Sequence, residues 1–145
     1  MATERRVGIA TLIAMLSVVM SGCAVPGQPG PQDYTGTWRL QGEDGRAAEF
    51  VLSADRTFTA RNIPIDLACR TGDVAASPPG CADDEYSTSF TGHWKTAEGS
   101  SPGIRLYHAG KFVRQGYPSS GGLGFFVQTL DVPRPDYLFV RADRK

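Results

Sequence analysis

Apolar residues recur at every second position in most segments after residue 34, and this alternation constrains the fold more than any other feature. A period of two puts successive side chains on opposite faces of a strand, whereas a helix needs a period of about 3.6. No stretch after residue 23 keeps the helical period. Apolar runs of strand type lie at 37–41, 48–53, 56–64, 86–96, 103–110, 123–130 and 136–143.

Turn sequences separate these runs. Glycine and proline, which favour turns, are frequent: the 145 residues include 17 glycines and 10 prolines. The turns fall at 42–45, 53–56, 97–103, 108–111 and 117–122. These seven runs, with the turns between them, predict an all-β antiparallel meander of roughly eight strands that closes as a calycin-like barrel, or alternatively folds as a β-sandwich. We expect 123–130, which is apolar on both faces, to be a central strand, and we expect Tyr86 to begin the inward face of 86–96.

The first 22 residues have the layout of a secretory signal peptide, with two arginines before an almost uncharged apolar run at 7–20. That run is shorter than the ~20 apolar residues that span a bilayer. Ser21, Gly22 and Cys23 resemble the bacterial lipoprotein box, in which cleavage precedes a cysteine that is then acylated. The resemblance implies lipid attachment at Cys23 and a place on the extracytoplasmic face of the cell membrane. An ordinary signal peptide with a stray cysteine and a retained anchor helix are the alternatives.

Three cysteines are an odd number for an exported protein. If Cys23 carries lipid, Cys69 and Cys81 are left to form a disulfide, which an oxidising compartment permits. Such a bridge would stabilise the fold by about 3 kcal/mol. Two free thiols or a metal site are the alternatives, and the lack of C-x-x-C with only two histidines disfavours metal.

Proline and glycine alternate in residues 23–34, a composition typical of a tether, and residues 35–145 have the length of one domain. The 15 basic residues balance the 15 acidic ones. No basic run is present, which disfavours nucleic acid as a partner. The acidic cluster at 83–85 is typical of a solvated loop.

The segment that begins with Gly36 and Trp38 resembles the first hairpin of calycin barrels, the lipocalin and avidin class, in which a G-x-W motif opens the first strand. The resemblance implies a barrel that can enclose a small apolar or amphipathic ligand. It also implies an arginine over the tryptophan, a part that Arg141 or Arg144 could take. The aromatic residues that would line a ligand site, or simply fill the core, include Trp38, Phe58, Phe90 and Trp94.

The chain also resembles small lipoproteins of actinobacteria, a resemblance that brings no activity with it. Its residues here are Asp55, Thr57, Phe58, Ala60, Ile63, Pro64 and Cys69.

The pattern of residues 35–39 recurs at 91–95. Residues 52–64 align with 106–118, and in this alignment Phe58 matches Phe112. Duplication and chance similarity between hairpins both explain this match.

Catalytic motifs are missing from the sequence. It has no G-x-S-x-G elbow, no H-E-x-x-H and no phosphate loop, and its two histidines, His93 and His108, suit surface positions. We therefore expect a non-enzymatic protein without a cofactor. The first hypothesis is an envelope module that contacts another protein or the cell wall through loop 66–85, and the alternative is a carrier of a small apolar ligand inside the barrel.

Overall fold

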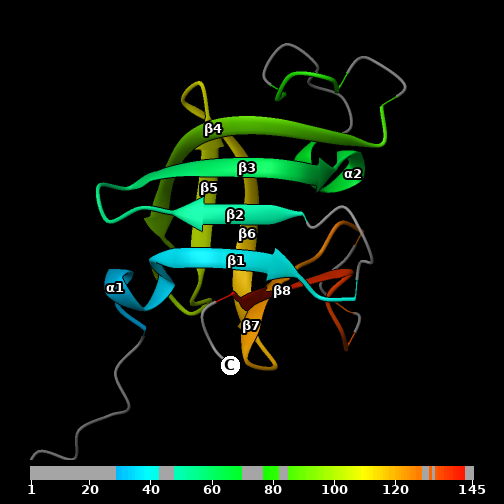
Figure 1. Cartoon of the computed structure of the whole chain (residues 1–145). Helices are drawn as coiled ribbons and strands as arrows, with labels where there is room; N and C mark the ends of the chain where they lie inside the picture. The colour runs from blue at the N-terminus through cyan, green and yellow to red at the C-terminus, as the bar shows by residue number, and fades with distance from the viewer. Residues whose placement is uncertain are drawn as a thin grey trace, which may run out of the picture.

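A computed structural model describes residues 29–42, 48–69, 77–81, 85–128, 131 and 133–142. The predicted signal peptide, Cys23 and most of the tether lie outside the described residues. Eight strands and two single-turn helices follow one another along the chain (Figure 1). They are α1 (Pro31–Tyr34), β1 (Gly36–Leu40), β2 (Glu49–Leu52), β3 (Thr57–Pro64), α2 (Ile65–Ala68), β4 (Ser87–Thr96), β5 (Ile104–His108), β6 (Lys111–Ser119), β7 (Gly122–Phe125) and β8 (Tyr137–Arg141).

The strands form one closed barrel in the order β1 to β8. Every neighbouring pair is antiparallel, and β1 pairs with β8 as well as with β2, so that Trp38 lies opposite Arg141 and Phe50. Closure leaves no unpaired sheet edge that could template aggregation. The predicted all-β antiparallel meander and its barrel are therefore confirmed, and the β-sandwich alternative is excluded.

Two predictions about individual segments were wrong. Strand β7 ends at Phe125 rather than running through 123–130, and Gly124 lets Pro135 lie against it, since a Cβ there would be 2.9 Å from the proline ring. Tyr86 does not begin the inward face, because β4 starts at Ser87 and Tyr86 is 92% exposed. Strand β6 has no simple alternation in the sequence because a bulge interrupts its pairing with β5.

Aromatic rings fill the barrel. The Phe50 ring centroid lies 4.9 Å from that of Phe139, 5.5 Å from that of Phe125 and 6.2 Å from that of Phe58, whose ring meets Phe90 edge-on at 5.6 Å. These distances are those of favourable ring pairs. The five phenylalanines form the centre of one continuous core.

Glycine makes room for these rings on the barrel wall. A Cβ at Gly92 would lie 2.8 Å from the Phe58 ring and 2.0 Å from the Tyr107 carbonyl oxygen. A Cβ at Gly116 would lie 2.8 Å from the Phe125 ring. At both places the wall is thinned to backbone so that a large ring fits inside.

The end of the barrel where β1 begins is closed by Trp38 and Trp94. Trp38 donates its indole N–H to the Tyr34 carbonyl of α1 at 2.8 Å, and the Arg141 guanidinium lies 5.1 Å from its ring. Arg141 takes the place over the tryptophan that the resemblance implied for Arg141 or Arg144; Arg144 lies outside the described residues. Gly36 beside this arginine has φ 134°, a backbone conformation that favours glycine.

Trp94 closes the same end from β4, with its indole N–H donated to the Ser53 carbonyl at 3.0 Å and Arg56 lying 4.7 Å from its ring. The two G-x-W segments therefore hold equivalent inward tryptophans. The alignment does not extend to Phe58 and Phe112, since Phe58 is in the core and Phe112 is 37% exposed.

Candidate functional site

The opposite end of the barrel is covered by α2, which follows β3 directly. Two residues of α2, Leu67 and Ala68, are buried in the core. The Cys69 N–H donates to the Ile65 carbonyl at 2.8 Å and so closes the turn. The predicted long loop over 66–85 is not irregular throughout, because its first residues belong to the helical turn α2 (Ile65–Ala68). The turn forms because two apolar residues there can close the core.

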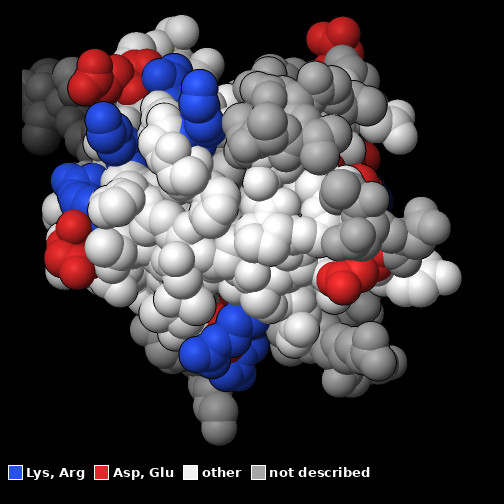
Figure 2. All heavy atoms as spheres, turned by 90° about the horizontal axis from the view of Figure 1, so that it is seen from above, with Lys and Arg blue, Asp and Glu red and all other residues white. Residues whose placement is uncertain are grey.

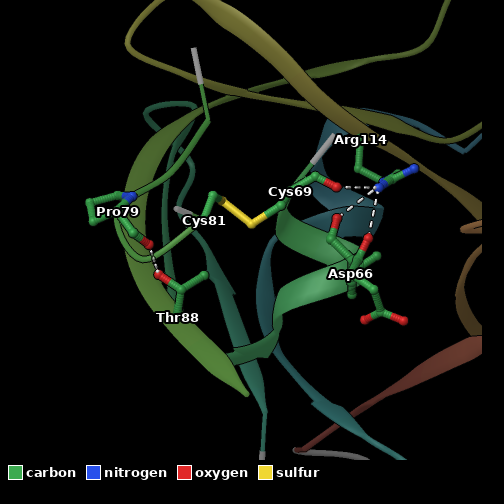
Figure 3. The surroundings of a disulfide bond; sticks show 7 residues. Asp66, Cys69, Pro79, Cys81, Thr88 and Arg114 are labelled. Carbon is green, nitrogen blue, oxygen red and sulfur yellow. Dashed lines mark hydrogen bonds between the residues drawn. A yellow bond between two sulfur atoms is a disulfide. The ribbon is translucent and has the colours of Figure 1, made fainter. Parts of the chain in front are cut away.

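Arg114 of β6 holds the carbonyl end of α2. Its guanidinium donates to the carbonyl oxygens of Asp66 at 2.9 Å, Leu67 at 3.1 Å and Cys69 at 3.2 Å (Figure 3). The last carbonyls of a helix have no partner within the helix and carry partial negative charge, so a cation is favoured there. One side chain from across the barrel mouth therefore fixes α2 in place.

The disulfide joins the end of α2 to the segment 77–81. The sulfur atoms of Cys69 and Cys81 are 1.96 Å apart and their Cα atoms 5.6 Å apart, so the predicted bridge is present (Figure 3). Thr88 of β4 donates its hydroxyl to the Pro79 carbonyl, which ties the same segment to the barrel wall. We call Ile65–Ala68, Cys69 and 77–81 together the stapled end.

Tyr137 of β8 completes this end. Its hydroxyl lies 2.9 Å from both carboxylate oxygens of Asp66, so α2 is held from two sides of the mouth. Its ring lines a surface hollow of about 270 Å³, together with Leu40, Ala48, Asn62, Pro64, Tyr86 and Ser87.

A second hollow of about 500 Å³ shares Asn62 and Ser87 with the first and runs along Pro79 and Gly80 to Glu85. Asn62 has φ 51°, a left-handed conformation, at the bulge where β3 loses register with β4. Its backbone N–H donates to the Ser89 hydroxyl at 3.1 Å. Two adjoining hollows, lined largely by polar residues, therefore lie beside the stapled end, and Tyr86 lines one of them.

The predicted ligand-lining residues lie in the core. Trp38, Phe58, Phe90 and Trp94 are exposed by only 6%, 2%, 6% and 0%. Neither hollow beside the stapled end has any of them in its wall. These side chains fill the interior of the described barrel.

Within the described part of the chain, neither histidine is hydrogen-bonded to a serine or cysteine side chain, as a nucleophile–base pair would require. His93 is exposed on β4, and His108 has its Nδ1 2.7 Å from the Thr91 carbonyl. Among the described residues no group of three or more His, Cys, Asp or Glu side chains could hold a metal ion. Of the acidic cluster at 83–85, only Glu85 is described, and it is exposed.

Two pKa shifts accompany this fold, both near the opposite end. Hydrogen bonds from the Thr57 hydroxyl and N–H lower the pKa of the exposed Asp55 carboxyl. Burial, with a smaller contribution from Asp33, raises the pKa of Tyr34. Neither group lies at the stapled end.

Arg114, Asp66 and Tyr137 were not predicted as site residues, although their contacts join β6, α2 and β8. Nothing local in the sequence indicates a bond between residues 45 or more positions apart.

No protein-family model matches the chain, and comparisons with curated proteins and with solved structures find no match. Within the described residues, no helix is long and apolar enough to cross a membrane.

Replacing Arg114 by Met should lower the free energy of unfolding by about 1–3 kcal/mol, because three carbonyls of α2 lose their donor. Denaturant titration followed by tryptophan fluorescence measures the change. Arg105→Met is the matched control, since the exposed Arg105 has one bond, to Gln115 at 3.2 Å, and should change stability by less than about 0.5 kcal/mol. Equal losses in both variants would contradict the role given to Arg114.

Proposed function

We propose that this chain is a lipid-anchored protein of the cell envelope whose role is to contact another envelope component rather than to carry a ligand or catalyse a reaction. The observation that supports the role most strongly is the filled interior. Phe50, Phe125 and Phe139 pack ring to ring at the centre. Small-molecule sites are concave pockets of about 300–1,000 Å³ lined mostly by apolar groups. In this barrel the apolar rings of the interior pack against one another instead of lining such a pocket.

The anchor is supported by the residues before the barrel. Cys23 belongs to a segment that resembles the lipoprotein box. Of the predicted Pro/Gly-rich tether 23–34, the last four residues form α1 and Tyr34 packs in the core, so residues before Pro31 separate Cys23 from the domain. The Cys69–Cys81 disulfide agrees with export, because such bridges persist in oxidising compartments.

The stapled end is the surface we assign to the contact. Binding residues are commonly found on loops that a rigid scaffold positions. Here the disulfide, Arg114 and Tyr137 make the supporting segment rigid, and Tyr86 offers a large exposed side chain. Exposed tyrosine is enriched among residues that dominate binding energy at interfaces.

The first prediction concerns the anchor. Cys23→Ser should move the protein from the membrane fraction to the soluble fraction, because acyl chains contribute about 0.8 kcal/mol per buried CH₂ and would be lost. Fractionation of the host with immunoblotting measures this. Cys81→Ser, which leaves Cys23 intact, is the control and should remain in the membrane. Retention of the Cys23→Ser protein would contradict the lipid anchor.

The second prediction concerns the contact surface. A photoactivatable amino acid at Tyr86, in the full-length protein in its own host, should give a discrete cross-linked product. The matched control replaces Glu98, which is exposed in the loop after β4 at the other end of the barrel. The same product from both positions, or none from Tyr86, would contradict the assignment of the stapled end.

A further inference from the structure

The outer side of β5 and β6, together with Phe126 just after β7, carries two pairs of partly exposed aromatic rings. The Tyr107 ring centroid lies 5.9 Å from that of Phe112, and the Tyr117 centroid lies 5.9 Å from that of Phe126. Phe112, Tyr117 and Phe126 also line one surface hollow of about 280 Å³, so the two pairs adjoin. Phe112 is 37% exposed. Aromatic residues gathered on the outside of a barrel mark an interaction surface.

The same strands carry only positive charge. Across β4, β5, β6 and β7, all fully described, there are four Lys or Arg residues and no Asp or Glu. Lys95, Arg105 and Lys111 are exposed, and the Lys95 ammonium lies 5.6 Å from the Tyr107 ring. The aromatic face is defined here as Lys95, Arg105, Tyr107, Lys111, Phe112, Tyr117 and Phe126.

The remaining strands differ in charge. Glu49 of β2 lies 3.1 Å from Arg39 and 3.7 Å from Arg61, so the cations on β1 and β3 have an acidic partner. Asp136, at the margin of the aromatic face, accepts the Val127 N–H at 2.7 Å. In the view down onto β4, charged side chains gather at the margins of a broad uncharged area (Figure 2).

We propose that the aromatic face lies against the surface of an anionic lipid bilayer. Tyrosine rings favour the headgroup region, and phenylalanine is found on the apolar faces of segments that lie in that interface. Each nearby Lys or Arg adds about 1 kcal/mol of attraction to anionic lipid. Two copies of this face would bring like charges together, which disfavours a dimer through it.

This inference rests on the proposed membrane anchor, and the tether is compatible with it. Residues 23–29 can extend by ~3.1 Å per residue. A tether of this length allows a domain anchored at Cys23 to orient its aromatic face toward the bilayer surface. A tethered face needs little affinity of its own, because the anchor supplies a high effective concentration.

The test uses the domain without its anchor, residues 29–145. All eight strands and every core residue of the described part of the chain lie within 34–141. Failure of the anchor and failure of the face are thereby separated. We expect the domain to co-sediment with vesicles of phosphatidylcholine and phosphatidylglycerol but not with phosphatidylcholine alone, and to be released as ionic strength rises.

Charge removal provides the matched comparison. Lys95→Gln, Arg105→Gln and Lys111→Gln together should weaken vesicle binding by roughly a hundredfold, at about fivefold per cation. Arg39→Gln with Arg61→Gln, on β1 and β3, should leave it within about twofold. Circular dichroism and thermal unfolding verify that each variant is folded.

Phe112→Ser separates a bilayer from other anionic partners. It should lower vesicle binding several-fold, because a ring in the headgroup region is lost. Three results would overturn the proposal: no binding to anionic vesicles, equal weakening by both sets of charge variants, or binding to soluble polyglutamate that equals vesicle binding and ignores Phe112→Ser. A dimer in sedimentation equilibrium that Phe112→Ser abolishes would overturn it too.

Discussion

The barrel depends on one constraint: an eight-stranded sheet that closes on itself encloses a space that inward side chains must fill. Here phenylalanine rings fill it, with Phe50 in contact with three others. Cores of this kind are packed as densely as organic crystals, so the wall must match the rings. Gly92 and Gly116 supply that match by presenting backbone where the Phe58 and Phe125 rings press outward.

Both ends of the filled barrel are closed by different means. At one end two tryptophans each donate an indole N–H to a backbone carbonyl and lie beneath an arginine. At the other, α2 is held by Arg114, by Tyr137 and by the disulfide to Cys81. A core closed in this way supports the proposal that the protein acts through its surface. The stapled end and the aromatic face are the two surfaces to which we assign contacts.

Local patterns predicted the barrel, because alternation and turn residues are read within a few positions of each other. The Cys69–Cys81 bridge was predicted by the count of three cysteines, once Cys23 was assigned to the lipid. Local patterns did not predict the end of β7 or the start of β4, because both depend on pairing with other strands: β7 pairs with β8 over Leu123–Phe125, and β4 starts where Ser87 pairs with Pro64. Arg114 was missed for the same reason: the carbonyls that it binds lie 45 or more positions away.

Native mass spectrometry of the oxidised domain purified from cells tests the filled interior most directly. The account predicts the mass of the bare polypeptide less the two hydrogens lost with the Cys69–Cys81 disulfide. It also predicts no adduct after incubation with a long-chain fatty acid. A stoichiometric small molecule that survives purification, and whose removal changes the fluorescence of Trp38 and Trp94, would contradict the account and make the protein a carrier.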